Sequence, residues 1–276
     1  MATRDIAFDG CKVSIKYEGQ EISDLLDFLF LDLNEVNDAS VVDTLTVRRN
    51  QEKERWELDK DGKSMFKGES LAGLGVILMG EVLFHLIREN SKGLAIHAGL
   101  VSDDQSTTLI PGASGNGKSS VTTWMLCNGK RYHTDELVSI DLDTQHVRPF
   151  TRPLNIKTRG VESIRQLVDL DSIDDQIRVS AGVTMIPHRL INPDFRKETP
   201  QISHVIFPKY IADSKPEVVK LSGAEAGLEL MRSNVIARNL PSHGFGEVIK
   251  LVRNIPAYKV HYQHFDDLPD LMSEVY

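Results

Sequence analysis

Residues 107–120 read Thr-Thr-Leu-Ile-Pro-Gly-Ala-Ser-Gly-Asn-Gly-Lys-Ser-Ser, and they contain the most specific motif of the chain. From Gly112 to Ser119 it matches the pattern G-x-x-x-x-G-K-[ST] in full, a pattern typical of a phosphate-binding loop between a strand and a helix. The alternative is a Gly-rich turn before an ordinary helix. A chance match in a chain of this length is on the order of one in a hundred, which favours the phosphate loop.

The chemistry of phosphate binding explains the residue types in this loop. Glycines let consecutive backbone N–H groups turn toward phosphate oxygens without a Cβ in the way. Lys118 suits the β- and γ-phosphates as a positive charge, and the Ser119 hydroxyl suits Mg²⁺. We therefore expect a nucleotide site made by Gly112, Ala113, Ser114, Gly115, Asn116, Gly117, Lys118, Ser119 and Ser120.

The segments around the loop favour an α/β fold with a mixed sheet. Residues 94–101 predict one strand and residues 107–110 the next, and the polar residues 102–106 between them predict a hairpin. Residues 119–127 predict a helix that ends at Asn128 and Gly129. An antiparallel hairpin therefore leads into the loop, unlike the common doubly wound arrangement.

Two adjacent acidic residues follow this helix. Asp135 and Glu136 lie at the edge of a predicted strand, which is the next strand after the loop and its helix. In phosphoryl transfer one carboxylate holds Mg²⁺ and another can take the proton of the acceptor. A solvated acidic turn is the alternative, which the phosphate loop upstream disfavours.

The first 92 residues predict a small β-rich region that ends in a helix. Residues 12–17, 41–48 and 56–58 predict short strands, with a turn at residues 59–62. Residues 71–90 predict a buried helix capped by Ser70. Later in the chain, Ser222 and Glu225 predict a capping box before a helix over 224–231. The chain therefore divides into residues 1–92 and a phosphate-loop domain over 93–276.

Composition narrows the classes of partner. The chain has 276 residues, a formal net charge of −8 and 41% hydrophobic residues, which is ordinary for a globular protein. The acidic balance disfavours nucleic acid as a partner. The two cysteines show no pairing or zinc-binding pattern, the first residues lack the apolar core of a signal peptide, and Glu81 interrupts the most apolar stretch. We expect a cytoplasmic protein with neither a nucleic acid nor a membrane as partner.

Four features together resemble the catalytic domain of HPr kinase/phosphorylase and its related kinases. They are the G-x-S-G-x-G-K-S loop, an upstream strand that carries His97, the acidic pair that begins at Asp135, and a short Asn-Gly turn before that pair. The resemblance covers about residues 93–160 and is loose beyond them. It implies a mixed-sheet P-loop domain of the phosphoenolpyruvate carboxykinase-like type.

The resemblance also implies roles for individual residues. Asp135 would be the general base, Glu136 would hold Mg²⁺ with Ser119, Lys118 would bind phosphate, and His97 would lie beside the transferred phosphoryl group. A histidine satisfied inside a buried strand is the alternative for His97. Two positions differ from the family pattern, because Glu136 replaces the usual Asp and Ser120 stands where the HPr enzyme commonly has Glu.

A basic segment follows the acidic pair. Between Thr144 and Val161 there are four basic residues and no acidic one, and these four are Arg148, Arg152, Lys157 and Arg159. They could clamp phosphate or an acidic acceptor. The alternative is a solvated strand edge on which positive charges prevent aggregation.

These features predict an ATP- and Mg²⁺-dependent kinase that phosphorylates a hydroxyl, most simply a serine of a peptide or protein. Two alternatives stay open: a regulatory module that binds the nucleotide without transfer, and a kinase of a small hydroxy-metabolite. The acceptor, the base preference and the role of residues 161–204 are open as well. Relatives of this fold often form homo-oligomers, but the sequence leaves the oligomeric state undecided.

Overall fold

The computed structural model describes residues 1–33, 39–113, 115–198 and 201–276. The chain forms two compact units, of which the first comprises residues 1–90, 151–161 and 170–187, and the second residues 91–150, 162–169 and 188–276. The predicted division at residue 92 differs from these units. The segments 151–161 and 170–187 belong with the N-terminal region because β12 (Leu154–Lys157), β14 (Val183–Ile186) and β13 (Arg178–Val179) form one small sheet there, with β13 beside α2 (Leu71–Ile87).

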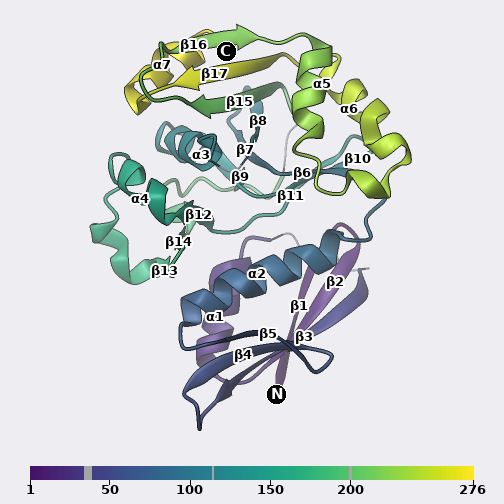
Figure 1. Cartoon of the computed structure of the whole chain (residues 1–276), viewed down its shortest axis with the longest axis vertical. Helices are drawn as coiled ribbons and strands as arrows, with labels where there is room; N and C mark the ends of the chain where they lie inside the picture. The colour runs from purple at the N-terminus through teal and green to yellow at the C-terminus, as the bar shows by residue number, and fades with distance from the viewer. Residues whose placement is uncertain (34–38, 114, 199–200) are drawn as a thin grey trace. The chain divides into compact units, whose positions relative to one another are not determined.

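The main sheet of the first unit has five strands in sequential order (Figure 1). The strands are β1 (Ala2–Phe8), β2 (Cys11–Tyr17), β3 (Ser40–Asn50), β4 (Arg55–Lys60) and β5 (Lys63–Gly68). Strands β2 and β3 pair in parallel, and α1 (Gln20–Phe30) lies between them in the chain, as a parallel connection requires. Asp9-Gly10 and Asp61-Gly62 turn two of the hairpins with positive φ at both residues, the conformation that Asp-Gly favours.

The predicted elements of this unit are present, with longer or shorter bounds. The strands expected at 12–17, 41–48 and 56–58 are β2, β3 and β4. Helix α2 begins after Ser70, whose hydroxyl accepts a hydrogen bond from the backbone N–H of Gly73. The helix ends at Ile87, before the predicted end at Asn90.

The second unit contains a six-stranded mixed sheet in the order β16-β17-β15-β8-β7-β9. Its strands are β16 (Glu217–Lys220), β17 (Ala257–Tyr262), β15 (His204–Tyr210), β8 (Thr107–Pro111), β7 (Ala98–Ser102) and β9 (Arg131–Thr134). The predicted hairpin is β7–β8, and β8 pairs in parallel with β15. Because β7 is antiparallel to both β8 and β9, the carboxyl ends of β8 and β9 lie at the same edge of the sheet. The carboxyl ends of β15 and β17 also lie there, since β15 is parallel to β8 and to β17.

The prediction of one continuous strand over 94–101 is wrong. The structure has β6 (Gly93–Ile96) and β7 in two different sheets, separated by His97. β6 pairs with β10 (Val138–Asp141), which pairs with β11 (Val147–Pro149). The backbone N–H of His97 donates to the carbonyl of Ser233 (2.7 Å). His97 therefore does not pair with a strand of either sheet through this group. The chain crosses between the sheets at this residue.

Side chains along β7 alternate between the core of the second unit and α3. Ala98 and Leu100 are buried in a cluster with β6, β10, α5 (Gly223–Met231) and α6 (Phe245–Val252). Gly99 points the other way, toward α3 (Lys118–Cys127), where a Cβ would lie 2.4 Å from the Thr122 hydroxyl. The remaining helices are α4 (Thr158–Arg165), α7 (Leu268–Ser273) and short 3₁₀ turns at 171–176, 188–190, 237–239, 241–244 and 265–267. The capping box of Ser222 and Glu225 is confirmed.

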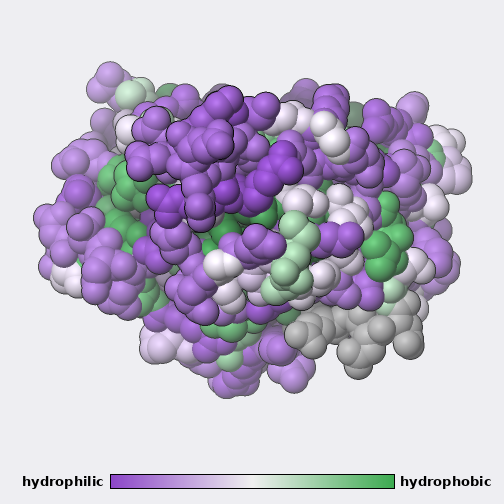
Figure 2. Space-filling view, turned by 90° about the horizontal axis from the view of Figure 1, so that it is seen from below, coloured by the Kyte–Doolittle hydropathy of each residue, from purple (hydrophilic) through white to green (hydrophobic). Residues whose placement is uncertain are grey.

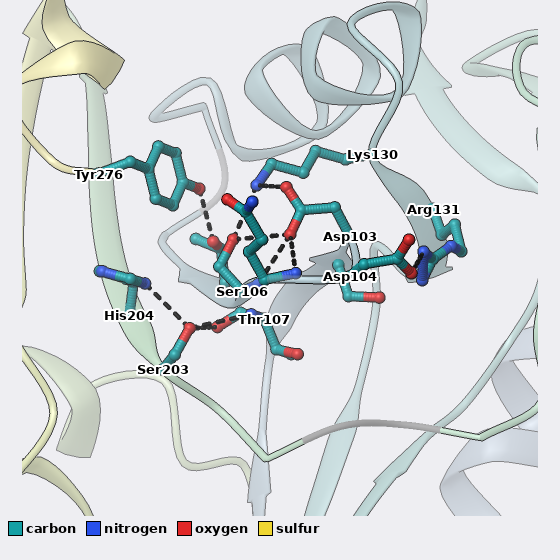
Figure 3. A network of polar contacts seen from close by, with 12 residues as sticks. Asp103, Asp104, Ser106, Thr107, Lys130, Arg131, Ser203, His204 and Tyr276 are labelled. Atoms are coloured by element: carbon teal, nitrogen blue, oxygen red, sulfur yellow. Dashed lines mark hydrogen bonds and ion pairs between the residues drawn. The ribbon is translucent and has the colours of Figure 1, made fainter.

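A polar network lies around the turn that joins β7 to β8, at the end of β8 away from the glycine-rich loop (Figure 3). Asp103 accepts hydrogen bonds from the backbone N–H groups of Gln105 (2.9 Å) and Ser106 (2.7 Å) and pairs with Lys130. The Lys130 ammonium also lies 4.3 Å from the centre of the Tyr276 ring. This network ties the turn of the hairpin to the start of β9.

The surface carries scattered apolar residues. On the face in Figure 2, hydrophilic side chains predominate and hydrophobic ones form small, separate areas, which is normal for a globular protein. In the part of the chain that the structure describes, no helix combines the length and the hydropathy needed to cross a membrane.

Candidate nucleotide site

The glycine-rich loop connects β8 to α3, as the motif predicts. Gly115 and Gly117 have φ of 99° and 90°, a region that favours glycine. The backbone N–H of Asn116 donates to the carbonyl of Ala113 (3.2 Å), and α3 starts at Lys118, so its N-terminal N–H groups face the loop. Ser114, a predicted site residue, lies outside the described residues.

Two tyrosines support the loop from the neighbouring parallel strands. The backbone N–H of Tyr210, at the end of β15, donates to the carbonyl of Asn116 (3.2 Å). The phenol of Tyr262, at the end of β17, donates to the carbonyl of Gly117 (3.4 Å). Burial raises the pKa of Tyr262 to about 12, although a hydrogen bond with Ser120 opposes the shift. The phenol therefore stays protonated at neutral pH.

Lys118 and Ser119 meet the first acidic residue at this edge. Lys118 is buried, and its ammonium donates to the main-chain oxygen of Asp135. The Ser119 hydroxyl lies 3.5 Å from Oδ2 of Asp135. The pairing of β7 with β8 and β9 produces this meeting, because it brings the end of β9 to the edge where the loop begins.

Asp135 is held from its other side by Tyr132. The Tyr132 phenol donates to Oδ1 of Asp135 (3.1 Å), and its ring stacks on His188 with centres 4.6 Å apart. Asp135 is only 1% exposed. Its two carboxylate oxygens thus face different partners, one the phenol and the other the Ser119 hydroxyl.

Glu136 faces His97 instead. The Nδ1 atom of His97 lies 2.8 Å from the main-chain oxygen of Glu136 and 3.5 Å from its Oε1. Both neighbours accept hydrogen bonds, so the proton of the neutral ring belongs on Nδ1. Burial and the positive charge of Lys118 lower the pKa of His97, and the Glu136 carboxylate only partly opposes them. The Glu136 side chain is 27% exposed, so this carboxylate is partly accessible to solvent, unlike that of Asp135.

The oxygen donors at the loop fit Mg²⁺. Adjacent ligands of octahedral Mg²⁺, at about 2.1 Å from the ion, lie about 3 Å apart, close to the Ser119–Asp135 separation. Among the described residues, no group of three or more His, Cys, Asp or Glu side chains could hold a metal. A cation here would depend on phosphate oxygens and water for its remaining ligands, as Mg²⁺ commonly does.

The four basic residues after the acidic pair do not form one cluster within a unit. Arg148 belongs to the second unit and pairs with Asp141 (3.4 Å), whereas the other three belong to the first. Arg152 is buried, and its guanidinium contacts the sulfur of Met79 (3.7 Å). Lys157 and Arg159 are exposed on β12 and α4. Their predicted role as a clamp stays a prediction.

Sequence reasoning missed the three tyrosines of this site. Tyr132, Tyr210 and Tyr262 each lie in or at the end of a strand, without a motif around them. One indication for Tyr132 was present in the sequence, because it closely precedes Asp135 and a buried phenol needs a hydrogen-bond partner. The other two become visible only when β15 and β17 are placed beside β8.

The chain is similar to solved structures but to no family model or curated sequence. No protein-family model matches the chain, and no curated protein matches its sequence. Among solved structures, the Hpr(Ser) kinase/phosphatase from Coxiella burnetii matches with a TM-score of 0.31 and 11% identity, over 66% of this chain and 92% of that chain. These values are too low to establish a shared activity, so the function must be inferred from the residues of the site.

Proposed function

We propose that this chain is a Mg·ATP-dependent kinase built on a P-loop domain of the phosphoenolpyruvate carboxykinase-like type. One observation carries the proposal: Lys118 and Ser119 of a complete phosphate-loop motif meet the buried carboxylate of Asp135 at one sheet edge. This combination suits a nucleoside triphosphate and its metal ion. Mg²⁺ would neutralise charge on the phosphates when bound.

The acidic pair supports transfer rather than binding alone. Asp135 is buried beside Ser119, whereas Glu136 is partly exposed and contacts His97. We propose that Asp135 holds the metal with Ser119 and that Glu136 takes the proton of the acceptor. This division is the opposite of the one that the family resemblance implies.

The proposed step transfers the γ-phosphoryl group to a hydroxyl. The acceptor oxygen forms a bond to the γ-phosphorus as the bond to the β,γ-bridging oxygen breaks, and ADP leaves with that electron pair. The hydroxyl proton passes to the carboxylate of Glu136. His97, with a proton on Nδ1, orients that carboxylate. Lys118 stabilises the charge on the phosphate oxygens.

The acceptor class rests on the family resemblance of residues 93–160, which points to a serine of a peptide or protein. The test is label transfer from γ-labelled ATP in a desalted lysate of the source organism, with Mg²⁺ and full-length protein. We expect a labelled protein or peptide band with the wild type and none with Glu136→Gln or Lys118→Ala.

Other outcomes would overturn the kinase proposal or its acceptor class. Tight Mg·ATP binding without any labelled product would indicate a regulatory nucleotide-binding module. Label that appears only in a small molecule, after the low-molecular-weight fraction is added back, would indicate a kinase of a small hydroxy-metabolite.

A further inference from the structure

An exposed aromatic ring stands beside the phosphate loop. Tyr210 is 52% exposed, although the residues from Val205 to Pro208 in the same strand are buried. Its backbone N–H is bonded to the carbonyl of Asn116 within the loop (3.2 Å). The residue that carries this ring is therefore hydrogen-bonded directly to the backbone of the predicted phosphate-binding loop.

The strand order indicates which end of a bound nucleotide lies toward β9 and which lies toward β15. β8, which carries the loop, has β15 on one side, and β7 followed by β9 on the other (Figure 1). The groups suited to the γ-phosphate end, Asp135 and Glu136, follow β9. A triphosphate chain is extended, so the nucleoside must leave the loop at the opposite end, on the β15 side. Strands in a sheet lie about 4.8 Å apart, which places Tyr210 within reach of that end.

The ring of Tyr210 packs against a second aromatic ring. It meets the ring of Tyr262 edge to face, with centres 5.9 Å apart and an interplanar angle of 68°. Tyr262 is itself buried and hydrogen-bonded to Gly117. This contact restrains the Tyr210 ring, and about half of the residue stays exposed to solvent, as a stacking surface requires.

We propose that Tyr210 is the stacking platform for the nucleobase of a nucleoside triphosphate bound at the loop. The inference rests on the proposed function and adds the base-binding part of the site. Stacking on an aromatic ring tolerates any base, because every base has a π-face. The platform therefore predicts affinity for the nucleoside part, with little discrimination between ATP and GTP.

The test compares nucleotide with inorganic tripolyphosphate, which has no base. Calorimetric titration of the full-length protein with Mg²⁺ gives the Kd for both ligands in the wild type, Tyr210→Ala and Tyr210→Phe. Base stacking contributes about 1–3 kcal/mol, so we expect Tyr210→Ala to weaken ATP binding roughly 5- to 150-fold. Tyr210→Phe should bind ATP like the wild type, and all three proteins should bind tripolyphosphate equally.

The control is Phe245→Ala, which removes another exposed aromatic ring (48% exposed) from the same unit, at the start of α6. It should leave both affinities unchanged. If Tyr210→Ala binds ATP as tightly as the wild type does, the platform is wrong and the proposed function stands. An equal loss of ATP and tripolyphosphate binding would also overturn the platform. If the wild type binds neither ligand, the proposed function fails and the platform with it.

Discussion

The phenol oxygen of Tyr132 lies 3.1 Å from Oδ1 of Asp135, inside the second unit. The same carboxylate turns its Oδ2 atom toward the Ser119 hydroxyl. Tyr132 is fully buried, and its ring stacks on His188. The phenol thus fixes the direction in which Asp135 presents its second oxygen. We interpret Tyr132 as a positioning residue for the proposed metal ligand.

The first prediction concerns Tyr132→Phe, which keeps the ring and removes the hydroxyl. A hydrogen bond to a charged group contributes about 1.5–3 kcal/mol, so we expect the Mg²⁺ concentration for half-maximal ATP binding to rise about tenfold or more. Calorimetric titration with ATP at a series of Mg²⁺ concentrations measures this. Tyr258→Phe, in β17, is the matched control. An unchanged Mg²⁺ requirement would reduce Tyr132 to a packing role.

The second prediction separates the two acidic residues. Glu136→Gln should leave Mg·ATP binding nearly unchanged and lower kcat by at least about two orders of magnitude, because it removes a general base. Asp135→Asn should instead raise the Mg²⁺ requirement, because it removes a charged ligand. Metal titrations and kcat measured on both variants show which residue holds the metal and which takes the proton. The reverse pattern would restore the division that the family resemblance implies.

The third prediction concerns Lys118→Ala. Loss of a charged donor to the phosphates should weaken ATP binding at least about tenfold. Calorimetry measures the Kd, and Lys220→Ala, an exposed lysine in β16, should bind like the wild type. Unchanged ATP affinity in Lys118→Ala would contradict the assignment of the loop.

The fourth prediction compares two glycines with nearly the same φ. Gly117 and Gly129 have φ of 90° and 88°. A Cβ on Gly117 would lie 2.1 Å from the Tyr262 phenol oxygen, whereas nothing lies within 4 Å of one on Gly129. The left-handed conformation alone costs an alanine about 1–2 kcal/mol.

Gly129→Ala should therefore lower the free energy of unfolding by about that amount and leave ATP binding intact. Gly117→Ala should destabilise the protein further and weaken ATP binding, because the loop or Tyr262 must move. Denaturant unfolding and calorimetry measure the two effects. Equal behaviour of the two variants would show that Tyr262 does not support the loop.

The fifth prediction concerns pH and Asp103. Burial raises the pKa of this carboxyl, but hydrogen bonds from Lys130 and from the backbone of Gln105 and Ser106 outweigh it and lower the pKa to about 2. The ordinary value of 3.8 applies to the unfolded chain. The stability that this carboxylate contributes is fully present above that value and is lost as the pH falls toward about 2.

Asp103→Asn should flatten the fall of unfolding free energy over this pH range, and Asp143→Asn, at an exposed turn, should not. Denaturant unfolding at a series of pH values measures the slope. An identical slope in Asp103→Asn and the wild type would show that other carboxyl groups cause the acid sensitivity.

Local sequence determined the central segment of this protein. The strand β8, the loop and α3 are encoded by neighbouring residues, since glycines permit the positive φ and Asn128-Gly129 ends the helix. The hairpin β7–β8, the cap at Ser70 and the capping box at Ser222 follow from equally short-range hydrogen bonds. The acidic pair was predictable too, because its distance from the loop is set by one helix and one strand.

The way these parts meet depends on contacts between residues that are far apart in the chain. The apolar residues on both sides of His97 hide the break there, where a hydrogen bond to Ser233, far along the chain, takes the backbone out of the strand. The pairing of β15 with β8 brings Tyr210 to the loop, and the burial of Asp135 distinguishes it from the more exposed Glu136. Such contacts join residues far apart in the chain, and no local pattern encodes them, because each depends on which strands become neighbours in the sheet.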